Sequence, residues 1–205
     1  MRAEGSAKRT AALLVAGGAV LVSSAALARP GSVSEREAGV FRILNSGLGP
    51  LEKPLWAVMQ SGNGLSALVV PALMVVSGRS RTDAGRAAAA GFGAWQIAKA
   101  VKRLVPRARP ALLLDDVHLR DGNPGGGGFV SGHATVSMAT AVVVAGGSSR
   151  PVKVGAFSTA LATGVARVHV GAHLPLDVIG GAALGLIWGG LCARLPLPKP
   201  GRCRP

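Results

Sequence analysis

Three short stretches of this sequence hold the residue types that phosphate chemistry requires. The first is basic and ends in a proline, the second is a serine-glycine-histidine turn, and the third combines an arginine, two histidines and an aspartate. Arginine forks and lysine ammonium groups neutralise phosphoryl oxygens, and backbone N–H groups at a helix start add the positive end of the helix dipole. In chain order, the candidate residues are Lys102, Arg109, Ser131, Gly132, His133, Arg167, His173 and Asp177.

The histidines and the aspartate could divide the work of a phosphoryl transfer. Pro175 fits the first turn of a helix, which puts His173 just before that helix and Asp177 within its first turn. A carboxylate that accepts the proton of one imidazole nitrogen leaves the other nitrogen free to attack phosphorus. His133 belongs to a different predicted helix and could protonate the leaving oxygen as a general acid.

With this order and spacing, the three stretches resemble the signature motifs of the type 2 phosphatidic acid phosphatases. These are membrane lipid-phosphate phosphatases of the vanadium haloperoxidase-like superfamily. The resemblance covers about residues 99–185, and Val130 and Ala166 stand where the family usually has proline and serine. It implies a six-helix bundle, an extracytoplasmic site and a phosphohistidine intermediate formed without a metal or other cofactor.

The family's functional residues carry over position by position. The resemblance implies that His133 is the general acid, that His173 is the nucleophile and that Asp177 orients it. The residues that would hold the phosphate are Lys102, Arg109, Ser131, Gly132 and Arg167.

Other interpretations of the histidines and glycines stay open. His169, His173 and Asp177 could form a site of two histidines and one carboxylate for a metal. That site needs one continuous helix through Pro175, which costs about 3 kcal/mol in a helix interior, so we expect no metal. We expect His169 to be a packing or supporting residue and His118 to be solvated. The run of residues 125–128, all glycine, is either a linker or a hinge over the site.

The chain that must position these residues is mostly apolar. Its 205 residues are 49% hydrophobic and 16% charged, against roughly a quarter charged in a soluble domain. Aromatic residues are scarce and glycine is abundant, which favours helices packed closely through small residues. We therefore predict an all-α, multi-pass membrane helix bundle with about six transmembrane helices. The predicted spans are Ala11–Ala28, Trp56–Ser77, Ala87–Val105, Val130–Gly147, Val154–Val170 and Leu176–Ala193.

The first span has two interpretations. It follows a basic start and ends in Ala26-Leu27-Ala28, so it is either a retained helix or a cleaved signal sequence, which would leave five spans. We divide the chain into an N-terminal segment (residues 1–28), a membrane-embedded phosphatase domain (residues 29–195) and a basic cytoplasmic tail (residues 196–205).

Loop charges predict the orientation in the cell membrane. Basic residues gather in the short connectors 78–86 and 148–153 and at both termini, which puts that side in the cytoplasm. The opposite, extracytoplasmic side carries the connectors 29–55, 106–129 and 171–175 and, with them, the candidate site.

The formal charge of +14 does not indicate a nucleic-acid partner, because the basic residues lie between apolar runs and form no block of five.

The expected partners are a lipid phosphate substrate and the bilayer. A protein that binds or transports anionic lipids could use the same cations without hydrolysis, and a haloperoxidase would use the same anion cradle. The nucleophile-orienter pair and the acid favour hydrolysis, because binding needs neither. Phosphatidic acid, phosphatidylglycerol phosphate, a polyprenyl phosphate or diphosphate, and a polyprenyl phosphosugar phosphate all remain open as substrates.

Overall fold

A computed structural model describes residues 2–28, 30–122 and 125–196 of the chain. Every regular element within these ranges is helical, which confirms the all-α prediction. Position 29 and most of the predicted tail, residues 197–205, lie outside the described residues. The α-helices are α1 (Arg2–Leu27), α2 (Glu35–Gly47), α3 (Glu52–Met59), α4 (Ser66–Val76), α5 (Arg81–Leu104), α6 (Gly132–Ala145), α7 (Arg150–His169) and α8 (Pro175–Cys192). Short 3₁₀ turns span Gly49–Leu51, Gln60–Gly62 and Pro110–Leu112.

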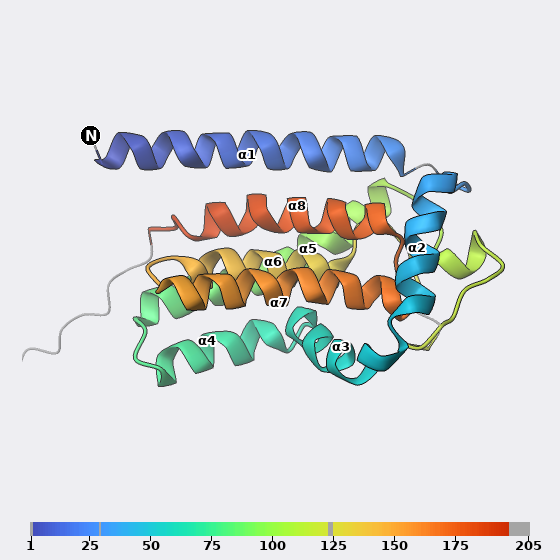
Figure 1. The fold of residues 1–205 in the computed structure, drawn as a ribbon. Helices are drawn as coiled ribbons and strands as arrows, with labels where there is room; N and C mark the ends of the chain where they lie inside the picture. The colour runs from blue at the N-terminus through green and yellow to red at the C-terminus, as the bar shows by residue number, and fades with distance from the viewer. Residues whose placement is uncertain (1, 29, 123–124, 197–205) are drawn as a thin grey trace, which may run out of the picture.

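The long helices lie side by side along one direction, and α2 stands across their ends (Figure 1). Helix α6 is central, because it packs against α5, α7 and α8, and α1 lies along α8 on the outside. The starts of α6 and α8 and the ends of α5 and α7 meet at the end of the bundle covered by α2. This arrangement brings the three candidate stretches to the same end of the molecule.

Glycines on α8 allow its close contact with α6. Gly181, Gly185 and Gly189 are spaced four residues apart and share one helix face. A Cβ added at any of them would lie 2.5–2.6 Å from a backbone oxygen of the α6 segment, which is closer than real Cβ contacts. Packing through small residues therefore fixes the start of α6 next to the start of α8.

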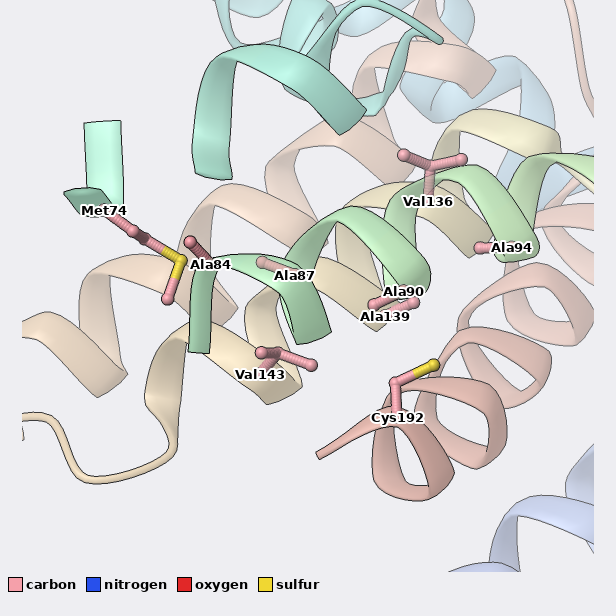
Figure 2. Packing of buried hydrophobic residues seen from close by; sticks show 9 residues of the cluster. All are labelled: Met74, Ala84, Ala87, Ala90, Ala94, Val136, Ala139, Val143 and Cys192. Atoms are coloured by element: carbon pink, nitrogen blue, oxygen red, sulfur yellow. The ribbon is translucent and has the colours of Figure 1, made fainter. Parts of the chain in front are cut away.

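Alanines have the same role on α5. They recur at the three- and four-residue spacing of one helix face, and that face is buried against α4, α6 and α8 (Figure 2). The residues of this cluster are Met74, Ala84, Ala87, Ala90, Ala94, Val136, Ala139, Val143 and Cys192.

Four predicted spans correspond closely to α5, α6, α7 and α8, and the first lies largely within α1. The prediction of one helix over Trp56–Ser77 is wrong. The chain forms α3, a 3₁₀ turn and α4 there, and the two halves are bent by 85°. The Asn63 side chain accepts a hydrogen bond from the Ser66 backbone N–H at 3.0 Å. This contact joins the bend to the first residue of α4.

The segment 29–55, predicted as a connector, contains α2. Ser34 begins this helix, because its hydroxyl accepts a hydrogen bond from the Glu37 backbone N–H. The sequence of α2 mixes charged and apolar residues, so it lacks the long apolar run on which the prediction of helices relied.

Few of the described helices are both long and apolar enough to cross a membrane by themselves. Helix α8 meets both conditions, and the bent pair of Gly49–Gly62 and Ser66–Val76 meets them only when taken together. Helix α6 is apolar but has 14 residues. Helices α5 and α7 have 24 and 20 residues but carry charged side chains. The prediction of about six membrane-length apolar helices is thus not met by this criterion.

Candidate active site

Most of the candidate residues converge on one pocket of about 310 Å³. The ends of α5 and α7, the start of α6, the loop before α8 and the bend between α3 and α4 all contribute to its wall. The lining residues are Gly62, Asn63, Gly64, Trp95, Ala98, Lys99, Lys102, Arg109, Gly125, Gly132, His133, Arg167 and His173. Six of the eight predicted site residues therefore line one cavity.

Two of the predicted phosphate-binding cations hold the glycine run in place. The Lys102 ammonium donates to the carbonyl of Gly127 at 2.8 Å. The Arg109 guanidinium donates to the carbonyls of Gly125 at 3.0 Å and Gly126 at 3.2 Å, and to that of Ala172 at 2.7 Å. The glycine run is thus bonded to both cations, and its first residue, Gly125, lines the pocket, so the run is not a free linker.

Arg167, the third predicted cation, already has an anionic partner. Its Nη1 donates to the Asp121 carboxylate at 2.6 Å and also lies 3.0 Å from the Met59 sulfur. The Arg167 side chain is almost fully buried, whereas that of Asp121 is partly exposed. A carboxylate is therefore bound where a phosphate oxygen is predicted to bind.

Ser131 and Gly132 start α6, as predicted. Gly132 and His133 line the pocket, but Ser131 is fully buried and does not. The Ser131 hydroxyl accepts a bond from the Ala134 backbone N–H at 3.5 Å, and its own backbone N–H donates to the Asp177 carbonyl at 2.8 Å. The structure thus gives Ser131 a role in capping α6 and joining it to α8.

His173 faces Asp177 on one side and Arg109 on the other. Its Nδ1 lies 3.6 Å from Asp177 Oδ2, which is longer than a hydrogen bond. Its Nε2 lies 3.4 Å from Arg109 Nη1, a group that can only donate. This contact favours the tautomer that carries its proton on Nδ1, toward the carboxylate, and leaves the Nε2 lone pair at the pocket.

Burial lowers the pKa of the His173 imidazole to about 3, against the opposing pull of Asp177 and with added repulsion from Lys102 and Arg109. The imidazole is therefore neutral at ordinary pH, as a nucleophile must be. Burial also lowers the pKa of Arg109, and repulsion from Arg167 adds to this effect. Arg109 and Arg167 are thus close enough for their charges to repel, which a bound phosphate would relieve.

Two buried charged residues behind the pocket, Arg107 and Glu37, were missed from the sequence. Arg107 is 1% exposed and forms ion pairs with Glu37 of α2 at 2.6 Å and with Asp177 at 2.9 Å. Burial opposes the charge of Arg107, but its bonds to Glu37 and Asp177 outweigh this and raise its pKa. The sequence signal for Arg107 was its place in the basic stretch, whereas Glu37 lay in a segment taken as a connector.

The remaining histidines lie away from the pocket lining. His169 ends α7, is fully buried and has its Nδ1 3.1 Å from the carbonyl of Leu44 in α2. His118 is exposed. The continuous helix that a metal site of His169, His173 and Asp177 would need is absent from this part of the described chain, because α7 ends at His169 and α8 begins at Pro175.

Comparison with known proteins agrees with this geometry. The family described as the PAP2 superfamily matches residues 85–199, more than half of the chain. The chain belongs to the PAP2 superfamily. Hydrolysis of phosphate esters is the chemistry of this superfamily, and the matched region contains all eight predicted site residues.

Two solved PAP2 structures share the fold. The crystal structure of Aquifex aeolicus LpxE has a TM-score of 0.69 at 25% identity, covering 77% of this chain and 94% of that one. The first transmembrane PAP2 type phosphatidylglycerolphosphate phosphatase from Bacillus subtilis has a TM-score of 0.68 at 18% identity, covering 87% and 93%. No curated protein matches the chain.

Proposed function

We propose that this PAP2 protein is an integral-membrane phosphatase that removes a phosphate group from a lipid phosphate or diphosphate through a phosphohistidine intermediate. The observation that carries the proposal is the meeting of His133, His173 and three cations in one pocket of about 310 Å³. Binding an anion needs only the cations, whereas a buried neutral imidazole next to a carboxylate suits nucleophilic attack.

The distribution of side-chain size supports a membrane location. Alanine and glycine fill the contacts between helices, while large apolar side chains such as Leu73, Phe92 and Leu161 are about 60% exposed. Small residues inside and large apolar residues outside suit helices surrounded by lipid. The Bacillus subtilis relative of the same fold is itself described as transmembrane.

In the first step, the Nε2 lone pair of His173 attacks phosphorus. The bond between phosphorus and the lipid oxygen breaks, its electron pair stays on that oxygen, and His133 donates the proton that the oxygen needs. Lys102, Arg109 and Arg167 hold the other phosphoryl oxygens and offset the charge that gathers on them.

In the second step, water attacks the phosphohistidine. His133, now neutral, takes a proton from the water, the phosphorus–nitrogen bond breaks, and its electron pair returns to Nε2 of His173. Inorganic phosphate leaves and both histidines regain their starting forms. With a lipid diphosphate the same steps release a lipid monophosphate.

The pocket wall supports entry of the substrate from the bilayer. Trp95 and Lys99 of α5 and the bend at Gly62–Gly64 line one side of the pocket, and Lys99 lies over the Trp95 ring at 3.3 Å. Helices α4 and α5 also carry exposed apolar side chains. A lipid chain could remain among them while its phosphate reaches the histidines. The loop charges predict that this end faces the extracytoplasmic side.

The test is phosphate release by the purified protein from phosphatidic acid, phosphatidylglycerol phosphate and polyprenyl phosphates and diphosphates. Because three cations can neutralise the phosphate, the assay contains excess chelator. We expect release by the wild-type protein, none by His173→Ala, and near-normal release by the control His118→Ala, since His118 is exposed outside the pocket. Binding of these lipids without release would identify a non-catalytic lipid-binding protein instead. Activity restored only by added divalent metal would contradict the proposed site.

A further inference from the structure

Asp177 belongs to a buried cluster of three charges. Arg107 Nη1 donates to Asp177 Oδ1 at 2.9 Å and to Glu37 Oε1 at 3.0 Å, and its Nη2 donates to Glu37 Oε2 at 2.6 Å. The side chains of Arg107 and Asp177 are fully buried and that of Glu37 nearly so. The fork of the guanidinium is thus turned fully onto Glu37, and only one of its nitrogens reaches Asp177.

The two carboxylates share a single guanidinium, so the cluster carries a net charge of minus one. Burying an unbalanced charge is costly unless another group compensates it. His173 faces the free side of the cluster, with its Nδ1 3.6 Å from Asp177 Oδ2, and this nitrogen is buried and has no hydrogen-bond partner among the described residues. The charges of Lys102 and Arg109 also act on Asp177, from the pocket. When Nε2 of His173 bonds to phosphorus, the imidazole keeps its Nδ1 proton and becomes cationic. The negative charge of the cluster is therefore balanced in the phosphoenzyme.

Glu37 also holds the backbone next to the nucleophile. Its Oε1 accepts a bond from the Leu176 N–H at 3.0 Å, and Asp177 Oδ2 accepts one from the Leu174 N–H at 2.9 Å. These two bonds flank Pro175 at the start of α8. Helix α2 is thus joined through one side chain to both the guanidinium and the first turn of α8, which follows His173.

We propose that Glu37 and Arg107 are positioning residues that act on the nucleophile through Asp177. Glu37 keeps the Arg107 guanidinium from neutralising Asp177, so Asp177 retains the charge that stabilises the cationic phosphohistidine. Arg107 keeps the carboxylate in place with one oxygen directed at His173. This role rests on the proposed phosphatase function and assigns to α2 a part in it.

The test compares Glu37→Gln with Glu35→Gln in the purified full chain. Glutamine retains the size and hydrogen-bonding reach of Glu37 but lets Arg107 turn its charge onto Asp177. Glu35 lies two residues earlier on α2, is exposed and serves as the control. We expect Glu37→Gln to lower kcat and the single-turnover rate of His173 phosphorylation by about tenfold to 100-fold, by analogy with the groups that orient metal-bound imidazoles. KM should change by less than about threefold, because no phosphate-binding group is altered, and Glu35→Gln should match the wild type.

A double variant separates positioning from mere stabilisation. Glu37→Gln with Arg107→Gln removes one charge of each sign and restores the net charge of minus one, so it should recover part of the phosphorylation rate lost in Glu37→Gln. The interaction between the two substitutions is read as a double-mutant cycle.

A folded Glu37→Gln protein with a lower Tm but unchanged kcat and phosphorylation rate would make the cluster structural only and overturn the proposal. A double variant slower than Glu37→Gln would overturn the charge argument. A wild-type protein without any phosphatase activity would contradict the proposed function itself.

Discussion

At the scale of single residues, the two histidines of the pocket are expected to fail in different ways. His173→Ala removes the group that attacks phosphorus, so turnover should vanish for every substrate. His133→Ala removes the acid, which a lipid alkoxide needs and an aryl oxygen largely does not. With an aryl phosphate, the His133→Ala protein should therefore become phosphorylated and stay so, because no base activates water. The measurement is acid-labile, base-stable phosphate on the protein after a rapid quench.

The same experiment can reverse the assignment. Phosphoenzyme trapped in His173→Ala and absent from His133→Ala would show that the roles of the two histidines are exchanged. Retention of lipid turnover in His173→Ala would remove the proposed mechanism altogether.

The buried state of His173 predicts how the reaction responds to pH. Protonation removes the attacking lone pair, so activity through this residue falls as pH drops through its pKa. Because burial lowers the pKa of His173 to about 3, the phosphorylation rate should not decline near pH ~6.5, where a free histidine titrates. His133→Ala with an aryl phosphate isolates this step. Its rate should stay level between about pH 4.5 and 8 after correction for the phosphate's own ionisation near pH ~6. A tenfold loss per pH unit below pH ~6.5 would mean that the imidazole is exposed and charged.

The Arg167–Asp121 pair predicts a competition for the phosphate site. A phosphate oxygen that binds Arg167 must displace a carboxylate now 2.6 Å away. Asp121→Asn removes that anion, so the vanadate concentration needed for half-maximal inhibition should fall several-fold. Asp116→Asn is the control, since Asp116 lies on the same connector as Asp121 and pairs with the exposed Arg42 of α2. Equal vanadate inhibition in all three proteins would show that Asp121 does not compete.

At the scale of elements, the glycines of α8 predict which substitutions outside the pocket should disturb the site. A Cβ at Gly185 would lie 2.5 Å from the Thr135 carbonyl of α6, whereas one at Gly190 meets no atom of the described residues within 4 Å. Gly185→Ala should therefore force α6 and α8 apart at a cost of ~1–3 kcal/mol. It should also lower kcat, because these helices carry His133 and Asp177. Gly190→Ala should keep the wild-type Tm and activity. Thermal unfolding in detergent and phosphate release check both, and equal Tm values would contradict the packing described for α6 and α8.

The elements also show what the sequence could and could not reveal. Long apolar runs correctly indicated α5 to α8, and Pro175 correctly indicated the start of α8. Hydropathy alone continued across Gly62-Asn63-Gly64, so it missed the 85° bend that lines the pocket. Helix α2 was missed because a helix lying across the bundle needs no long apolar run. Spacing motifs led to the residues expected to touch phosphate, but Glu37 and Arg107 are joined to Asp177 only by the fold, across 70 or more positions of sequence.

At the scale of the whole molecule, α1 packs along α8 near the site. A Cβ at Gly17 would lie 3.0 Å from Ile187, and Ser24 of α1 lies next to Gly180. From these contacts we propose that residues 11–28 are a helix retained in the bundle.

The direction of the whole bundle in the membrane is the last prediction. Basic connectors at one end, with Arg81 and Arg150, predict the cytoplasmic face, while the pocket end should face outward. Single cysteines at Ser80 and at Ala111 test this in a background without Cys192 and Cys203. Both positions are exposed, and they lie at opposite ends of α5. In intact cells, an impermeant thiol reagent should label the cysteine at position 111 and spare that at position 80, while opened membranes should allow both to react. Labelling of position 80 alone would show that the bundle has the opposite membrane orientation, with phosphate released inside the cell.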